Sequence, residues 1–277
     1  MKVLNLTKQM QTSFLGREFP DGAGMKVCTI RPSDAEQLLE TNLDNRNISN
    51  TKVQQYASDM AGGRWAMNGE SIIIAKDGML NDGQHRLWAC LEAKVTFDAV
   101  VVYGVERETR TTVDQGKTRG AGDYLGMSGT KNANNIAAIS RMMLAYQKTG
   151  HINRLGDFTN AETLEFARAN ATDLEDAYAV SHIAPKTFRS FASPTMIGAA
   201  AYMLRNKGDL ALQYLTQIMT GENIAQGDPA YRVRERLAGF PKGSRSPRLE
   251  AVLRGWLAFR DGRQLQLIRI TGDLPAL

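Results

Sequence analysis

The sequence of 277 residues contains only two cysteines, Cys28 and Cys90, and neither belongs to a CxxC pair or a Cys/His cluster. This spacing excludes a disulfide scaffold and a zinc ribbon, and the apolar neighbours of both residues predict buried thiols. The longest apolar-rich runs, 95–103 and 196–204, are far shorter than the roughly 20 residues of a membrane span, and the N-terminus lacks the apolar segment of a signal peptide. We therefore expect a soluble, cytoplasmic protein with no membrane partner.

Internal repeats and low-complexity tracts are also absent, and the charge imbalance is small, with 34 Lys and Arg against 29 Asp and Glu. The imbalance is not uniform along the chain. Residues 1–120 carry 15 basic and 15 acidic side chains, whereas residues 121–277 carry 19 and 14. The excess is concentrated between Arg232 and Arg269, and we call this stretch the basic stripe. Such a stripe can follow a nucleic-acid backbone, or it can form a solvated helix face that pairs with acidic residues.

Strand and helix patterns alternate in the first part of the chain. Residues 1–24 predict an irregular lead-in, because proline and glycine interrupt any pattern there. Ser33 and Glu36 have capping-box spacing, and Ser49 or Asn50 can cap a second helix. The predicted strands are 25–30, 71–75 and 95–103, the predicted helices are 33–41, 50–61 and 87–93, and an Asp-Gly pair at 77–78 predicts a hairpin turn. Residues 25–115 therefore predict a small α/β domain.

Strand patterns nearly vanish after residue 120. Six helices are predicted, at 132–149, 160–170, 194–206, 210–219, 229–237 and 248–260, and Thr159 and Glu162 again have capping-box spacing. The fold class predicted for the whole chain is α+β, with the N-terminal α/β domain followed by an all-helical domain at 116–277. The polar segment Asp114–Arg119 is interpreted as the linker, since it lacks the spacing of a Walker loop.

The segment Asp82-Gly83-Gln84-His85-Arg86 holds the most informative side chains, between a predicted strand and a predicted helix. Gly83 permits a tight turn, and the backbone N–H groups at a helix start face an anion. Arg86 supplies a fork that suits phosphate oxygens, His85 could help to hold a polyphosphate, and Asp82 could bind Mg²⁺ or accept a proton. The same residues also fit a structural interpretation, with Asp82 as a cap, Gly83 as a turn, Arg86 in an ion pair and His85 as a hydrogen-bonding core residue.

The string Asp82–Arg86, after a short hairpin and before a helix, resembles the signature of the ParB/sulfiredoxin superfamily. The match is to the Asp-Gly-Gln-His-Arg variant of uncharacterised phage and mobile-element ParB-like proteins, and Asn45-Arg46-Asn47, Ala61–Trp65 and Asn68-Gly69-Glu70 fit the same pattern over residues 25–115. The resemblance implies a bound nucleoside triphosphate, ATP or CTP, with Mg²⁺. It also implies the role of each motif residue: His85 and Arg86 contact phosphate, Gly83 and the helix start at Gln84 cradle it, and Asp82 lies beside the metal or the transferred group.

Two departures from this superfamily limit what its members' activities imply here. Gln84 occupies the place of the sulfiredoxin catalytic cysteine, so sulfinic-acid repair is not expected. The arginine-rich motif and helix-turn-helix domain of the partition proteins are not found either. The hypothesis that results is a nucleotide-binding protein, a phosphotransferase or NTPase of phage or mobile-element DNA metabolism, acting in the host cytoplasm if phage-encoded.

Other residues offer secondary roles and two alternatives. Arg46 could reach a phosphate, and Glu70 could act as a general base toward a hydroxyl group. One alternative is a DNA-binding or regulatory module that uses the basic stripe, and the other is a metal-dependent nuclease with Asp82 and Glu70 as ligands. The stripe residues proposed to contact nucleic acid are Arg232, Arg234, Arg236, Lys242, Arg245 and Arg248.

Overall fold

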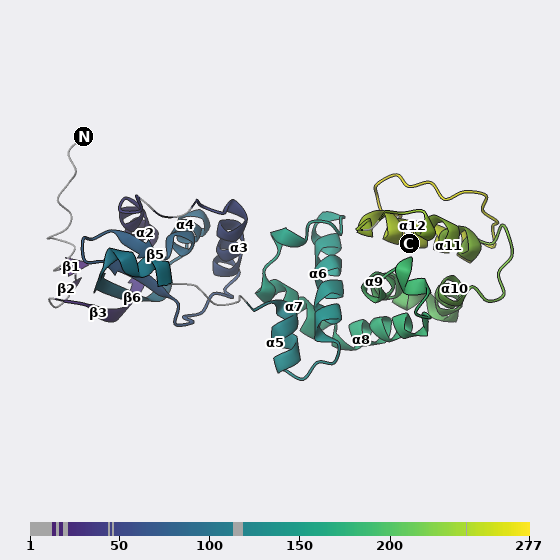
Figure 1. Ribbon diagram of the computed structural model, residues 1–277, viewed down its shortest axis with the longest axis horizontal. Coiled ribbons are helices and arrows are strands. Elements are labelled where there is room, and N and C mark those ends of the chain that lie inside the picture. The colour runs from purple at the N-terminus through teal and green to yellow at the C-terminus, as the bar shows by residue number, and fades with distance from the viewer. Residues whose placement is uncertain are drawn as a thin grey trace. The chain divides into compact units, whose positions relative to one another are not determined.

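The computed structural model describes residues 13–14, 17–18, 22–43, 45, 47–112, 119–241 and 243–277. The chain divides into two compact units, 1–118 and 119–277, which we call the N-terminal unit and the helical unit (Figure 1). The sequence placed the corresponding boundary between residues 115 and 116. Over the described ranges, no helix has both the length and the apolar character needed to cross a bilayer.

The N-terminal unit contains a four-stranded sheet in the order β3-β6-β4-β5. Strands β3 and β6 are antiparallel, β6 and β4 are parallel, and β4 and β5 are antiparallel. The strands are β3 (Gly24–Ile30), β4 (Ser71–Ala75), β5 (Leu80–Asp82) and β6 (Phe97–Val105), and a separate two-stranded sheet joins β1 (Ser13–Phe14) and β2 (Arg17–Glu18). Alternate residues of β6 face the core, as expected for a sheet covered on one side.

The predicted Asp-Gly turn joins β4 to β5. Gly78 adopts a left-handed φ of +83°, and the Ala75 N–H donates to the Met79 carbonyl at 2.8 Å. A residue with a side chain is disfavoured at that φ, so glycine suits the position. The predicted hairpin is therefore confirmed.

Three helices lie side by side along the sheet, α2 (Pro32–Leu39), α3 (Asn50–Ala61) and α4 (Gln84–Ala93), with α4 in the middle; the 3₁₀ helix η1 (Arg107–Thr112) follows β6 (Figure 1). The start predicted for α2 is wrong. The helix begins at Pro32, whose fixed φ suits the first helical position, and the Arg31 N–H donates to the Asp34 carboxylate at 2.9 Å. Ser49 does cap α3, since its Oγ accepts from the Lys52 N–H at 3.4 Å.

Helix α4 begins earlier than the sequence predicts. Its pattern of apolar residues indicated a start at Leu87, but the first turn contains Gln84, His85 and Arg86. The helix ends at Ala93, and its C-cap, Lys94, is a non-glycine residue in the left-handed conformation. The polar residues of the motif are thus the start of the helix that packs at the centre of this unit.

The core of the N-terminal unit lies between these helices and the sheet. Its fully buried members include Ile30, Leu38, Ile72, Leu87 and Val101. Both cysteines belong to this core, as predicted, and Cys90 Sγ donates to the Val95 carbonyl at 3.1 Å. Burial, with a smaller contribution from the charge of Asp34, raises the pKa of Cys90 to about 11.

The helical unit contains no strand among its described residues, so the predicted α+β class is confirmed. The α-helices are α5 (Ala121–Met127), α6 (Ala133–Thr149), α7 (Asn160–Ala169), α8 (Ala171–Val180), α9 (Pro194–Leu204), α10 (Gly208–Thr220), α11 (Pro229–Ala238) and α12 (Arg245–Arg260). Short 3₁₀ helices lie between them, η2 (Leu155–Asp157), η3 (Ser181–Ile183), η4 (Phe188–Ser190) and η5 (Arg205–Lys207). A core cluster of its own, distinct from that of the N-terminal unit, holds the unit together.

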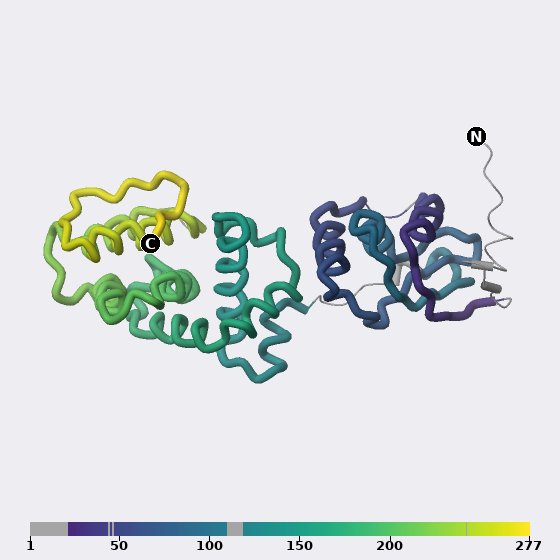
Figure 2. The backbone as a smooth tube through the Cα atoms, turned by 180° about the vertical axis from the view of Figure 1, so that it is seen from behind, coloured from purple at the N-terminus to yellow at the C-terminus, as the bar shows by residue number. Residues whose placement is uncertain are grey.

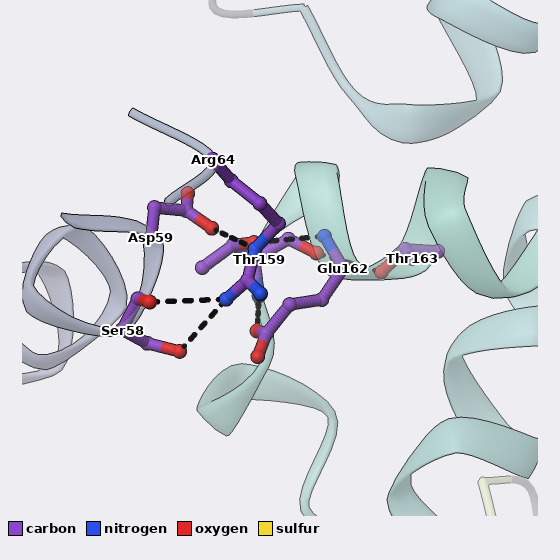
Figure 3. Close-up of polar contacts among 6 residues, drawn as sticks. All are labelled: Ser58, Asp59, Arg64, Thr159, Glu162 and Thr163. Atoms are coloured by element: carbon purple, nitrogen blue, oxygen red, sulfur yellow. Dashed lines mark hydrogen bonds and ion pairs between the residues drawn. The ribbon is translucent and has the colours of Figure 1, made fainter. Parts of the chain in front are cut away.

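The start of α7 confirms one predicted capping box. Thr159 Oγ1 accepts from the Glu162 N–H at 3.0 Å, and the Glu162 carboxylate accepts from the Thr159 N–H at 2.9 Å (Figure 3). Each side chain therefore satisfies a backbone donor that the helix leaves unpaired.

The segment after α12, yellow in Figure 2, contains no helix and is tied to α12 through Glu250. The buried Glu250 carboxylate accepts from the backbone N–H groups of Thr271 and Gly272, at 2.7 and 3.1 Å, and from Arg254 Nε at 2.7 Å. Burial raises the pKa of this carboxyl group, but the hydrogen bonds outweigh burial and leave the pKa below its ordinary value.

Candidate functional site

The candidate site of the N-terminal unit is the junction of β5 and α4. Asp82 ends β5, Gly83 turns the chain with a φ of +108°, and Gln84 begins α4. The left-handed backbone favours glycine here, and a Cβ atom at Gly83 would force the end of the buried Ile72 side chain to shift. The motif residues are consequently held against the sheet.

Arg86 is the buried cation of this junction, with only 8% of the residue exposed. Its Nη2 donates to the Ser71 carbonyl at 2.8 Å and to Asp82 Oδ2 at 3.0 Å. Its Nη1 lies 3.9 Å from Glu70 Oε2, beyond hydrogen-bond reach, and is buried without a hydrogen-bond partner among the described residues. One nitrogen of this guanidinium therefore keeps its hydrogen-bonding capacity unused.

Two carboxylates flank Arg86. The Asp82 side chain is 23% exposed and that of Glu70 63%, so both remain within reach of a ligand from solvent. Among the described residues, no group of three or more His, Cys, Asp or Glu could hold a metal ion by itself. Two hard carboxylate oxygens do suit Mg²⁺ when phosphate oxygens complete its coordination, so the donor set fits a nucleotide-bound magnesium.

His85 and Gln84 are both buried and bonded to the chain segment that precedes α3. His85 Nε2 accepts from the Ser49 N–H at 3.0 Å, so this nitrogen carries no proton. Gln84 Oε1 accepts from Asn42 Nδ2 at 3.0 Å. Both side chains thus position the motif against a neighbouring segment.

A second arginine beside the motif, the half-buried Arg107, was not predicted from the sequence. Arg107 Nη1 donates to the Leu80 carbonyl at 2.8 Å and to Asn81 Oδ1 at 3.0 Å, while its Nη2 is buried without a hydrogen-bond partner. Asn45 Nδ2 reaches the same Leu80 carbonyl at 2.6 Å. Arg107 and Arg86 therefore contact opposite ends of β5, and the place of Arg107 just after a strand was the one available signal.

The predicted residues Arg46 and Lys242 lie outside the described residues. Most other residues predicted to contact nucleic acid are engaged within the helical unit. Arg234 donates to the carbonyls of Ile218 and Met219 at the end of α10, and Arg232 donates to the Leu265 carbonyl and pairs with Glu235. The Arg234 contacts satisfy carbonyls at the end of α10, and the Arg232 contact holds the segment after α12.

Arg248 makes the widest set of such contacts. Its guanidinium donates to the carbonyls of Phe191, Phe240 and Pro241, at 2.8, 3.0 and 2.9 Å. Arg236 lies over the Phe240 ring, 4.5 Å from its centroid. Of the proposed nucleic-acid contacts that the structure describes, only Arg245 is exposed without a partner.

No protein-family model, no curated protein and no solved structure matches the chain.

Proposed function

We propose that the N-terminal unit binds a nucleoside triphosphate, ATP or CTP, with Mg²⁺ at the β5–α4 junction, and acts as a phosphotransferase or NTPase in phage or mobile-element DNA metabolism. The resemblance of Asp82–Arg86 to the ParB/sulfiredoxin superfamily suggests this class. The observation that carries the proposal is the buried Arg86 Nη1, which lacks a hydrogen-bond partner.

An unsatisfied buried donor of this kind is costly. Leaving one costs about 1–3 kcal/mol, and native proteins keep few of them. A phosphate oxygen is the acceptor that a guanidinium fork suits best, since the hydrogen bond is charge-assisted. Arg86 is therefore the residue that we assign to phosphate binding.

The neighbouring carboxylates explain why the nucleotide should carry magnesium. Asp82 and Glu70 face the same guanidinium and would repel a bare polyphosphate. Bound Mg²⁺ would neutralise charge on the phosphates and on these carboxylates. Glu70, the more exposed of the two, can accept a proton from an acceptor hydroxyl group, while Gln84 and His85 keep the junction in place.

The two alternatives receive less support. The described arginines of the basic stripe are mostly bonded within the helical unit, which leaves few of their guanidinium donors for DNA phosphates. A nuclease would use the same Asp82 and Glu70, but these two carboxylates fall short of the ligand set of a two-metal site. Both alternatives are outcomes that the following experiment can reveal.

The test is a thermal-shift panel of ATP, CTP, GTP and ADP, each with and without Mg²⁺, on the wild type and on Arg86→Ala. A ligand that binds only the folded state raises the melting temperature. At a free ligand concentration of 100 times Kd, it adds about 2.7 kcal/mol to the free energy of unfolding. We expect one triphosphate with Mg²⁺ to stabilise the wild type and to leave the midpoint of Arg86→Ala unchanged.

Arg64→Ala is the matched control. Arg64 is a half-buried arginine of the N-terminal unit that, like Arg86, bonds a carboxylate, Asp59 at 2.9 Å, and a carbonyl, that of Ser58 at 3.0 Å (Figure 3). This variant should keep the nucleotide response. If nucleotide stabilises folded Arg86→Ala as much as it stabilises the wild type, the assignment is refuted. If no nucleotide stabilises the wild type but the protein cleaves plasmid DNA or binds DNA, the alternatives are favoured.

A further inference from the structure

The helical unit contains a pocket of about 370 Å³ lined by residues of α5, α6, α9 and α12. Its size lies within the range of small-molecule sites, about 300–1,000 Å³. Apolar side chains dominate its wall, among them Met142, Ile152 and Met196. Its described charged lining residues are both arginines, Arg141 and Arg245, and none is acidic.

Neutral acceptors hold Arg141 in place on the wall. Its Nε donates to Thr163 Oγ1 at 3.2 Å, and its Nη2 donates to Asn160 Oδ1 at 2.7 Å. Asn160 is itself fixed, since its Nδ2 donates to the Arg119 carbonyl at 3.0 Å. The guanidinium is therefore oriented before any ligand arrives, which lowers the entropy cost of binding.

No described carboxylate compensates the positive charge of Arg141. Over the described ranges, no carboxylate lies within ion-pair distance of Arg141, and its Nη1 makes no hydrogen bond. Burial lowers the pKa of Arg141, as expected for a cation that has lost part of its hydration. A half-buried cation without a counter-charge is stabilised by an anion.

We propose that this pocket binds a small organic anion with an apolar body, whose carboxylate or phosphate head group is held by Arg141. Met142, Met196 and the other apolar side chains contact the body of the ligand. Arg245, which is exposed and has no partner in the described part of the chain, adds a second positive charge. This site lies wholly within the helical unit and does not depend on the function proposed for the N-terminal unit.

Calorimetric titration of the full chain with three naphthalene probes tests the proposal. 2-Naphthoate and 2-naphthyl phosphate carry the two candidate head groups, and 2-naphthamide is the neutral counterpart of the carboxylate. We expect at least one anion to bind on the order of tenfold more tightly than the amide, because a charge-assisted hydrogen bond replaces a neutral one. The ratio between the two anions identifies the head group.

Two variants separate the charge from the cavity. Arg141→Met should bring both anions to the affinity of the amide. Ala138→Trp places a large side chain at an exposed lining position of α6 and should weaken all three probes while Arg141 stays intact. Arg168→Met, which removes an exposed arginine of α7 outside the pocket, controls for net charge.

Three results would overturn the proposal. The first is that the wild type binds the amide and both anions with equal affinity. The second is that the wild type binds none of the three probes. The third is that a folded Arg141→Met variant still binds one of the anions more tightly than the amide. If Arg141→Met does not fold, as judged by circular dichroism, unchanged anion binding by Ala138→Trp overturns it instead.

Discussion

At the scale of single residues, Gly83 shows how closely the motif is fitted to the sheet. Its φ of +108° disfavours any residue with a side chain, and a Cβ atom there would also displace the end of the Ile72 side chain. We expect Gly83→Ala to destabilise the protein by about 1–3 kcal/mol, because backbone strain adds to a steric clash. The measurement is the denaturant midpoint at constant m-value.

Gly63→Ala separates the two contributions to that loss. Gly63 also has a left-handed φ, +68°, but no heavy atom lies within 4 Å of the position of an added Cβ. This control should lose only the backbone contribution, about 1 kcal/mol. Equal losses in the two variants would show that Ile72 moves aside without cost.

The residues of the motif could be predicted from the sequence, but their partners could not. Residues 82–86 are consecutive, so the motif is visible in the sequence as a single string. Asn42 and Arg107 are distant in sequence, and only the strand order of the sheet and the packing of α4 bring them to the junction. The Ser49 N–H that occupies His85 Nε2 belongs to the same class of long-range contact.

At the scale of secondary-structure elements, the sequence predicted those that glycine, proline or a capping residue separates. The sequence prediction ended a helix at 170 and missed α8, because Asn170, the C-cap of α7, serves directly as the N-cap of α8 with no loop between the two helices. Helix α5 contains Gly122 and Gly126, which disfavour a helix by about 1 kcal/mol each, and tertiary packing of Leu125 outweighs that propensity.

The hydrogen bonds by which Glu250 holds the segment after α12 have a defined pH dependence. Because hydrogen bonds hold the pKa of Glu250 below its ordinary value, its ionised form stabilises the folded state. This stabilisation is complete above the unfolded pKa, about 4.3, and is lost as the pH falls through the lower folded value. We therefore expect the stability difference between wild type and Glu250→Gln to be large at pH 6 and to shrink at acidic pH.

Urea unfolding at pH 6 and at successively lower pH values measures that difference. Glu235→Gln is the control, because its carboxylate is half-exposed in an i,i+3 pair with Arg232 and such surface pairs contribute little. A difference between wild type and Glu250→Gln that does not change with pH would show that ionisation of Glu250 does not hold the segment after α12.

At the scale of the whole molecule, the main hydrophobic core of each unit shares no residue with that of the other. One contains described residues between Cys28 and Tyr103, and the other contains residues from Ala121 onward. Leu38 and Leu253 are fully buried, one in each core. We expect Leu38→Ala and Leu253→Ala each to destabilise one unit by about 2–5 kcal/mol.

Hydrogen exchange of the full chain, followed by peptide mass spectrometry, reads out each unit separately. Leu38→Ala should accelerate exchange in peptides from residues 22–112, and Leu253→Ala in peptides from residues 119–277. Uniform acceleration along the whole chain in either variant would mean that the two units unfold as one.

Separate cores also determine where a folding defect can be repaired. A second substitution that restores packing around a truncated Leu38 must fill space in the same core, so compensating mutations for Leu38→Ala should map to the N-terminal unit. Those for Leu253→Ala should map to the helical unit. We therefore expect core residues of the N-terminal unit and of the helical unit to be substituted independently of each other.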